Sequence, residues 1–358
     1  MQTLQSITLT QFRNYSFRKF DCHAKVVAIS GNNGVGKTNL LDAVYYLCFT
    51  KSYFQSREIN NVQEGKDGFR IEGIFATEAE MERTAIVWKE GKKKLSNNDV
   101  LVEKMTDYIG KHTALMIAPD DIELVNGGST IRRKFIDGLL SQANREYLEH
   151  LLGYQKVLEQ KNALLKQPGY IQVQEPLLEV YDLQLAQYGG YLMQQRQQIS
   201  SRIPEMVRHF YTKIAGIHEA IDVVYQACVP SAEQLIELFR YNRRRDIEAK
   251  RCTAGLHTED WQLLLNGLPY KTHASQGQKK SVLIALKLSQ LETLSALGKA
   301  PIILLDDIFE KLDMHRLQRL FGVLSQLEVR QIFMTHTHAE DMRQALAPHF
   351  EDIISIAL

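Results

Sequence analysis

The chain has 358 residues, 44% of them hydrophobic, and its 43 Lys and Arg against 42 Asp and Glu leave a formal charge of +1 at pH 7. A chain of this length buries a large core as one elaborated domain or two, and its balanced charge excludes a strongly basic nucleic-acid-binding domain, so any contact with DNA must be a local patch. Four cysteines without C-x-x-C spacing argue against a zinc site or a disulfide framework, and without a signal-like or membrane-spanning apolar run we expect a cytoplasmic protein with no membrane association.

The first elements predicted along the chain are strands, a glycine-rich loop and a helix. Apolar residues recur over 4–12 and run together over 26–29, which predicts two strands at the start of a sheet. Residues 39–49 have the apolar spacing of a helix. The loop between the second strand and this helix therefore has the context of a P-loop.

The loop itself reads Gly-Asn-Asn-Gly-Val-Gly-Lys-Thr and fits the P-loop pattern G-x-x-x-x-G-K-[ST]. Glycines let backbone N–H groups wrap phosphates at a helix N-terminus, where partial positive charge accumulates. Lys37 adds a cation for the β- and γ-phosphates of ATP, and Thr38 adds a hydroxyl for Mg²⁺. A plain glycine-rich turn is the alternative. The predicted nucleotide contacts are Gly31, Asn32, Asn33, Gly34, Val35, Gly36, Lys37 and Thr38.

In the middle of the chain, the sequence pattern predicts a β-rich flank of antiparallel strands, followed by helices. The strands are expected at 69–75, 85–88 and 94–102. Helical spacing follows over residues 131–166 and again over 175–214, with a break at Pro168-Gly169. A helix of about 35 residues is roughly 50 Å long, so this helical hairpin should be a stubby lobe rather than a long coiled-coil arm. A strand over 221–225 and a helix over 231–250 complete the middle.

A tetrapeptide in the last third, Ser275-Gln276-Gly277-Gln278, resembles the signature motif S-G-G-Q of ABC-type ATPases, with Gln276 in place of one glycine. In that class the signature serine and a helix N-terminus are offered to a γ-phosphate that a second subunit binds. Taken alone, the tetrapeptide is better explained as a helix cap. Its place shortly before an acidic strand end favours a nucleotide contact by Ser275, Gly277 and Gln278.

That strand is the apolar run 301–305, which ends in Asp306 and Asp307 and has the form of a Walker B motif. We expect Asp306 to hold Mg²⁺, directly or through water, and Asp307 to orient the attacking water as a catalytic residue. ABC-type ATPases usually carry a glutamate where this chain has Asp307. The alternative is a surface turn with two adjacent carboxylates by chance.

Two further motifs follow in the order typical of ABC-type ATPases. Leu312-Asp313 matches the D-loop, and His336, after the apolar residues 332–334, matches the switch histidine that contacts the γ-phosphate. A lone histidine at a strand end is more often structural. The ordered set favours a catalytic role for His336.

Several segments together resemble the RecF family of ATPases. They are residues 12–15, 34–43, 119–121 with 124–125, 132–137, the signature segment, and 305–307 with 310–313. The resemblance implies an α/β fold, an ABC/SMC-like P-loop ATPase head with an inserted, mainly helical lobe. We expect the head in residues 1–130 and 251–358 and the lobe in residues 131–250.

The same resemblance implies an ATP-dependent homodimer that acts in DNA replication and recombinational repair. Such a dimer binds single-stranded DNA, gaps and junctions of single- and double-stranded DNA, and a slow, DNA-stimulated ATPase acts as the switch that releases it. The implied partner is a RecR-type mediator, with recombinase loading and SOS induction as the outcome.

Two departures from the family pattern stand out. Its usual G-P-H-R-D-D stretch appears as Gly-Leu-His-Thr-Glu-Asp at 255–260, and residues 117–120 lack the glutamine of the ABC glutamine loop, whose role stays unassigned. The basic clusters 92–94, 132–134 and 243–245 are candidate DNA contacts, and a solvated charged face is the alternative for each.

Three other functions are weighed against this one. A transporter's motor subunit is disfavoured by the long stretch between P-loop and signature. A defence nuclease is disfavoured because the chain after His336 is too short for a metal-nuclease domain. A small-molecule P-loop kinase would need neither the signature serine nor the D-loop.

Overall fold

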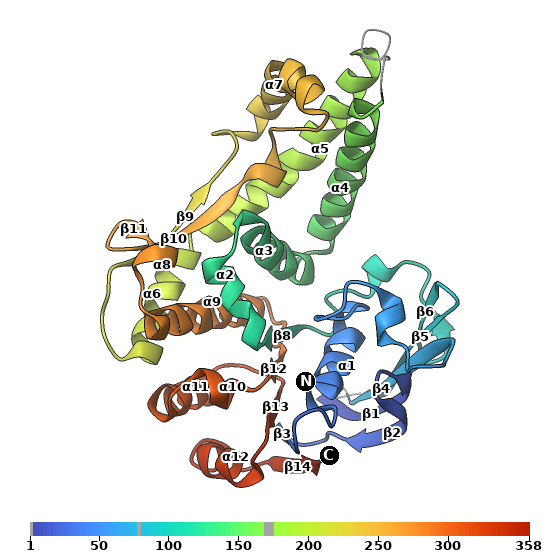
Figure 1. Ribbon diagram of the computed structural model, residues 1–358, viewed down its shortest axis with the longest axis vertical. Coiled ribbons are helices and arrows are strands. Elements are labelled where there is room, and N and C mark those ends of the chain that lie inside the picture. The colour runs from blue at the N-terminus through green and yellow to red at the C-terminus, as the bar shows by residue number, and fades with distance from the viewer. Residues whose placement is uncertain (1–2, 77–79, 168–174) are drawn as a thin grey trace. The chain divides into compact units, whose positions relative to one another are not determined.

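The computed structural model describes residues 3–76, 80–167 and 175–358 (Figure 1). The chain forms two compact units. The first consists of Met1–Asp121, Lys213–Gly216 and Lys287–Leu358, and the second of Ile122–Thr212 and Ile217–Leu286. Residues 251–286, which the sequence groups with the ATPase head, cluster with the second unit. The predicted break at Pro168-Gly169 lies outside the described residues.

Among its described residues, the first unit holds two sheets. The five-stranded sheet is parallel, in the order β14-β3-β13-β12-β8, with β3 (Val26–Ser30), β8 (Ala114–Ile117), β12 (Ile302–Leu305), β13 (Gln331–His336) and β14 (Ile353–Ala357). The six-stranded sheet is antiparallel, in the order β2-β1-β4-β5-β6-β7, with β1 (Thr3–Phe12), β2 (Tyr15–Asp21), β4 (Gly68–Ala76), β5 (Met81–Lys89), β6 (Lys92–Asn97) and β7 (Val100–Leu101). Every residue of β3, β8, β12 and β13 is buried, as expected for a parallel sheet covered on both faces.

The predicted antiparallel flank is confirmed in β4 to β7, but the expectation that residues 4–12 and 26–29 start one sheet is wrong. The strand β1 lies in the antiparallel sheet and β3 in the parallel one. The strand β2 between them was not predicted, because its apolar alternation stops after Phe17 and four consecutive side chains in it are exposed. Pairing with β1 along the sheet edge holds it in place.

The predicted first helix is α1 (Lys37–Phe49), and it packs between the two sheets. It contacts β13 and β8 of the parallel sheet and β4 and β5 of the antiparallel one. One hydrophobic core joins α1 to residues of both sheets, and within it the rings of Phe12, Tyr46 and Phe69 make edge-to-face contacts. This packing places the N-terminus of α1 at the carboxyl end of β3.

The remaining elements of the first unit are short helices. α10 packs on β13, α12 packs on β3, and α11 lies against both helices. Their bounds are η1 (Glu58–Asn61), η2 (Met105–Asp107), α10 (Ile308–Lys311), α11 (Met314–Gln326) and α12 (Ala339–Leu346). Three elements have residues in both units: η3 (Pro119–Ile122), α6 (Ile203–Ala215) and α9 (Gln276–Ala296).

The second unit is mainly helical, and α4 and α5 pack together as the predicted hairpin. Its elements are α2 (Glu123–Asn126), α3 (Ser129–Ala143), α4 (Arg145–Leu165), α5 (Glu175–Ser200), β9 (Ile221–Gln226), η4 (Ala232–Gln234), α7 (Leu235–Ala249), η5 (Leu256–Thr258), β10 (Asp260–Leu265), β11 (Leu268–Pro269) and α8 (Tyr270–His273). The strands form a sheet in the order β11-β10-β9.

The predicted 35-residue helix over 131–166 is in fact two helices. Asn144 has an extended backbone, with φ of −139°, and its side chain accepts the backbone N–H of Tyr147 at 3.3 Å, which caps α4. The run 175–214 is likewise divided, and Pro204 lies in the first turn of α6, where a missing N–H costs nothing. The longest arm of the hairpin is therefore α5, of 26 residues or roughly 39 Å.

Buried ion pairs join the helices of the second unit. Lys161 of α4 lies 2.8 Å from both Asp182 of α5 and Asp246 of α7, and all three side chains are essentially inaccessible. Removing one member would leave uncompensated charge in the core, which makes such a triad a strict packing constraint.

The segment 255–260, which departs from the family pattern, has a structural role in this unit. Gly255 has φ of +123°, and a Cβ there would lie 2.7 Å from the Tyr154 hydroxyl, so only glycine fits. Glu259 lies 2.6 Å from the buried Arg196, and Asp260 accepts two hydrogen bonds from Arg132. The segment thus holds α3 and α5 through paired charges.

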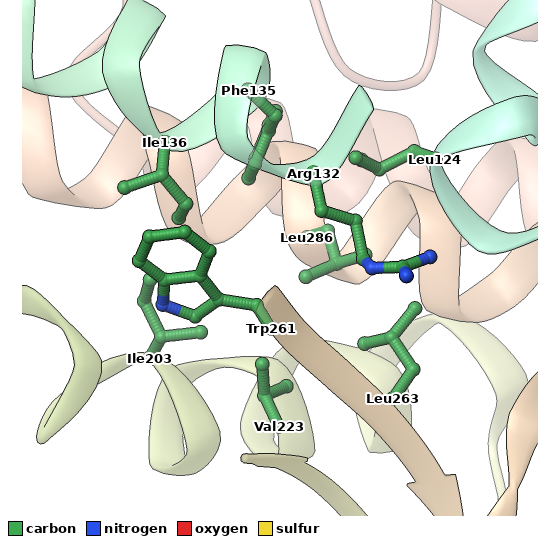
Figure 2. A pocket seen from close by; sticks show the side chains of 9 residues that line it. All are labelled: Leu124, Arg132, Phe135, Ile136, Ile203, Val223, Trp261, Leu263 and Leu286. Carbon is green, nitrogen blue, oxygen red and sulfur yellow. The ribbon is translucent and has the colours of Figure 1, made fainter. Parts of the chain in front are cut away.

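A narrow apolar seam marks the core of the second unit (Figure 2). Figure 2 shows Trp261 of β10 and Ile136 of α3 pointing toward one another, and the stem of Arg132 covers one side. The open space is about 10 Å³, which is room for about one water molecule. The seam is packing and no ligand site.

Candidate nucleotide site

The loop part of the P-loop motif, residues 31–36, connects β3 to α1 and depends on its glycines. Gly31, Gly34 and Gly36 have φ of +153°, +86° and +115°. A Cβ on Gly36 would also lie 2.5 Å from the amide of Asn14 and 2.7 Å from the hydroxyl of Tyr15. Both the backbone conformation and the available space therefore require glycine at position 36.

The turn between β1 and β2 packs directly on this loop. The Tyr15 hydroxyl donates to the Gly36 carbonyl at 3.0 Å, and the Asn14 amide donates to the Val35 carbonyl at 2.8 Å. Asn39 of α1 donates to Asn14 in turn, at 2.8 Å. Residues 12–15 supported the family resemblance in the sequence, and the structure shows what they contact: they brace the loop and the first turn of α1.

In the same turn, Arg13 pairs with the carboxylate of Asp42 inside α1 and donates to the side chain of Asn39 at 2.8 Å. Burial raises the pKa of Asp42, and the charge of Arg13 with hydrogen bonds from Ser52 and Tyr53 opposes that rise. The pair fixes the helix that carries Lys37 to the turn between β1 and β2.

Lys37 folds back across the loop. Its ammonium donates to the carbonyls of Gly31 at 2.7 Å and Asn32 at 3.0 Å, and the Asn33 side-chain oxygen lies at 3.5 Å. The residue is only 6% exposed. These carbonyls keep the ammonium against the loop that the sequence assigns to phosphate.

At the end of β12, the carboxylate of Asp306 accepts hydrogen bonds from the hydroxyls of two threonines. Thr38 donates to its two oxygens at 2.9 and 3.1 Å, and Thr335 donates to Oδ1 at 2.8 Å. Burial raises the pKa of Asp306, and the two hydroxyls act against the rise. A hydroxyl and a carboxylate oxygen in contact suit Mg²⁺, which takes few protein ligands and completes its shell with water and phosphate. Within the described ranges no cluster of three or more His, Cys, Asp or Glu side chains could hold a metal by itself.

Asp307 follows in a left-handed backbone conformation, with φ of +47° and ψ of +40°, just before α10. Its N–H donates to the Thr335 hydroxyl at 3.0 Å. Its Oδ1 is buried and has no hydrogen-bond partner among the described residues. This oxygen is therefore not committed to another group among the described residues.

His336 ends β13, the strand between β12 and β3. Its ring stacks on Phe309 with centroids 4.4 Å apart and planes at 16°, and its Nε2 lies 3.5 Å from the Asp341 carboxylate. In the D-loop, Asp313 caps α11 by accepting the N–H of Arg316 at 3.0 Å, and this bond lowers the pKa of its carboxyl.

The signature residues begin α9 and lie in the second unit. Ser275 and Gln278 form a reciprocal cap: the Ser275 hydroxyl accepts the N–H of Gln278 at 3.2 Å, and Gln278 accepts the N–H of Ser275 at 2.7 Å. Gln278 also donates to Glu219 at 2.7 Å, and the carbonyl of Gly277 accepts the Ser281 hydroxyl at 3.1 Å. Ser275 is exposed at the helix N-terminus, so capping leaves it accessible.

The structure thus brings the P-loop, Asp306, Asp307 and His336 together at one edge of the parallel sheet. Sequence reasoning did not find the contact of Thr335 with both aspartates. The register pairs Leu305 with Met334, which places Asp306 beside Thr335, and that pairing was the missing signal. The segment after β8 contains no glutamine that could act as the glutamine of the ABC class. The carboxylate of Asp121 in this segment is not a substitute, because it is bonded to Tyr53 and Lys287.

A P-loop and an acidic strand end meeting at the carboxyl edge of a parallel sheet, with an antiparallel sheet across the P-loop helix, define a P-loop ATPase of the ABC/SMC type. The RecF/RecN/SMC N terminal domain family matches residues 3–355. The chain belongs to this family, and within it to RecF.

Relatives and solved structures agree with this assignment. The DNA replication and repair protein RecF of Cytophaga hutchinsonii is 34% identical over 93% of this chain and 88% of its own length, and that of Bacteroides thetaiotaomicron is 34% identical over 96% and 93%. A structure of the recombination mediator protein RecF-ATP in the RecFOR pathway is 28% identical, covers 99% of this chain and 95% of its own, and has a TM-score of 0.87. The Smc head domain of Pyrococcus furiosus shares the fold, with a TM-score of 0.57 at 13% identity over 99% of this chain and 93% of its own.

No helix among the described residues is both long and apolar enough to cross a membrane.

Proposed function

We propose that the protein is an ATP-dependent DNA-binding protein of DNA replication and recombinational repair, whose homodimer closes on Mg²⁺-ATP and opens on slow hydrolysis. The observation that carries the proposal is the contact of Thr38 with Asp306, which joins a P-loop helix to an acidic strand end. Relatives named DNA replication and repair protein, and solved RecF structures named with ATP and ATPrS, support it.

Each residue then has a defined task. Lys37 and the loop amides bind the phosphates, and bound Mg²⁺, held by Thr38 and Asp306, neutralises phosphate charge. Asp307 orients the attacking water and accepts its proton, and His336 contacts the γ-phosphate. A RecR-type mediator is the partner that this family assignment favours, with recombinase loading and SOS induction downstream.

Sedimentation of the purified protein tests this function. We expect a monomer without nucleotide, a dimer with Mg²⁺-ATP, and a larger complex when a gapped duplex is added. A monomer that ignores both ATP and DNA would contradict the proposal. A transporter motor or a defence ATPase would dimerise with ATP but show no preference for the gapped duplex over an intact one.

Ser275→Arg should prevent ATP-dependent dimerisation while each monomer still binds ATP within about threefold of wild type. The exposed serine at the start of α9 is offered to the nucleotide of the second subunit, and an arginine there is too large to approach it. Sedimentation with ATP checks the dimer, and binding of a fluorescent ATP analogue checks the monomer. Ser281→Ala, which removes a hydroxyl bonded within the same helix, is the control. A Ser275→Arg protein that still dimerises would reduce Ser275 to a helix cap.

Each of the three basic clusters contains a paired residue: Arg132 is bonded twice to Asp260, Arg243 lies within 2.8 Å of Glu179 and Asp182, and Lys93 pairs with Glu58. Each cluster also has exposed residues, so exposure alone does not separate them. Lys92 and Lys94 are exposed and have no ion-pair partner among the described residues. Lys92 lies directly opposite Lys89 across the β5–β6 hairpin, an arrangement of like charges that an anion would relieve.

We therefore assign the DNA phosphate contact to the β5–β6 face of the antiparallel sheet. Lys92→Gln/Lys94→Gln should weaken binding of every DNA sequence and reduce the slope of log K against log salt by about two, since each lysine bound to a phosphate accounts for roughly one unit. Fluorescence anisotropy over a salt series gives the slope. The exposed pair Lys156→Gln/Lys213→Gln is the control, and an unchanged slope in the Lys92/Lys94 variant would rule out this face.

A further inference from the structure

We propose that Thr335 is a positioning residue that sets both acidic side chains of the site through a single hydroxyl. The inference rests on the proposed function, because it concerns Mg²⁺-dependent ATP use. Thr335 is fully buried near the end of β13, between the strand that leads to the P-loop and the strand that leads to Asp306.

The hydroxyl of Thr335 has only one possible orientation. The backbone N–H of Asp307 can only donate, so at 3.0 Å the Thr335 oxygen must accept from it. The single hydroxyl proton is then left for Oδ1 of Asp306, at 2.8 Å. One side chain is thus bonded to a carboxylate and to the backbone of the next residue.

The first consequence concerns Asp306. Its Oδ1 accepts a hydrogen bond from Thr335 at 2.8 Å, and the single hydroxyl proton of Thr38 is shared between Oδ1 at 2.9 Å and Oδ2 at 3.1 Å. A carboxylate oxygen accepts about two hydrogen bonds. Oδ1 is therefore the more fully occupied oxygen, and Oδ2 keeps a free lone pair for a cation. The bond from Thr335 to Oδ1 prevents the carboxylate from rotating.

The second consequence concerns Asp307. A non-glycine residue with φ of +47° is held in a sparsely populated conformation, which requires support from its surroundings. The hydrogen bond from the backbone N–H of Asp307 to Thr335 supplies that support. The side-chain Oδ1 of the same residue is buried and has no hydrogen-bond partner among the described residues. Thr335 therefore ties the position of the water-orienting carboxylate to that of the metal-binding one.

Thr335→Val tests this role, because valine keeps the shape and removes the hydroxyl. The matched control is Thr113→Val: Thr113 is equally buried at the opposite end of the same sheet, where its hydroxyl donates to the Lys299 carbonyl at 3.1 Å. Both variants remove a buried hydroxyl of the sheet, and only Thr335→Val removes one that is bonded to the site. Thr335→Ser restores the hydroxyl without the methyl group.

The measurements are ATP affinity as a function of Mg²⁺ concentration, the single-turnover hydrolysis rate, and the melting temperature without nucleotide. For Thr335→Val we expect the Mg²⁺ concentration at half-maximal ATP binding to rise about tenfold, the consequence of removing one hydrogen bond to a charged group, and hydrolysis to slow by at least as much. Thr335→Ser should remain within about threefold of wild type, and Thr113→Val should change only the melting temperature.

Two outcomes would overturn the inference: a Thr335→Val protein with the Mg²⁺ dependence of Thr113→Val, or a serine variant as defective as the valine one, which would make the methyl packing decisive. If the valine variant does not fold, Thr335→Ala takes its place under the same comparison. Failure of the proposed function is a separate result, because wild-type protein would then show no Mg²⁺-dependent ATP binding at all.

Discussion

Replacing Lys37 by alanine should weaken ATP binding at least about 100-fold and abolish both the ATP-dependent dimer and ATP-dependent retention on gapped DNA. Lys37 carries the one charge of the P-loop, and the carbonyls of Gly31 and Asn32 hold its ammonium in place. A charge-assisted hydrogen bond is worth roughly 1.5–3 kcal/mol, and in the proposed function the ammonium contacts two phosphates. Equilibrium binding of a fluorescent ATP analogue measures the decrease in affinity.

Lys19→Ala is the control for this experiment, since Lys19 is an exposed lysine on β2 of the same unit. Both variants should melt at similar temperatures without nucleotide. Wild-type affinity in Lys37→Ala would refute the assignment of residues 31–38 as the phosphate site. A decrease in affinity of similar size in Lys19→Ala would point to a nonspecific charge effect instead.

The parts of the fold that could be predicted are those that local sequence determines. The apolar runs before Gly31 and Asp306 are buried on both faces, and such runs are typical of parallel strands. The glycines of the P-loop are required by backbone angles at their own positions, so the loop is visible in the sequence without knowledge of its neighbours. Strand, loop and helix were therefore predicted in their correct places.

The parts that escaped prediction depend on contacts between distant residues. The strand β2 is held by its pairing with β1 and not by its own apolar pattern. The break at Asn144 is a cap whose effect depends on one side-chain rotamer. Thr335 is an ordinary strand residue until the register places its hydroxyl against Asp306, which lies 29 positions earlier in the chain.

The pairing of basic residues in the second unit also could not be predicted from the sequence. Arg132 and Arg243 were candidates for DNA contact because the sequence shows basic residues in clusters. In the fold their partners, Asp260 and Asp182, come from other helices and strands, and the pairs serve packing. Whether a basic cluster is available for phosphate is a property of the folded surface, which composition does not reveal.

Replacing Asp307 by asparagine should slow ATP hydrolysis by about 100-fold or more, the usual contribution of a positioned general base, and should lengthen the lifetime of the dimer on gapped DNA. Asparagine preserves the shape and leaves Lys37, Thr38 and Asp306 to bind Mg²⁺-ATP, so closure should survive while release fails. Wild-type hydrolysis should itself be slow. Aspartate is one methylene shorter than the glutamate usual in this class, and a base must lie within about 2.6–3.2 Å of the proton it accepts, or act through one water.

The companion variant Asp306→Asn separates binding from chemistry. It removes the carboxylate that accepts the hydroxyls of Thr38 and Thr335, so Mg²⁺-dependent ATP binding should weaken along with hydrolysis. The two variants therefore differ in the dissociation rate from gapped DNA, which should fall for Asp307→Asn and rise for Asp306→Asn. The backbone N–H of Asp307, and not its side chain, is bonded to Thr335, and its Oδ1 has no hydrogen-bond partner among the described residues, so the substitution keeps the contact that holds the backbone. Hydrolysis at the wild-type rate in Asp307→Asn, or faster release of DNA, would mean that another group activates the water and that hydrolysis does not time the release.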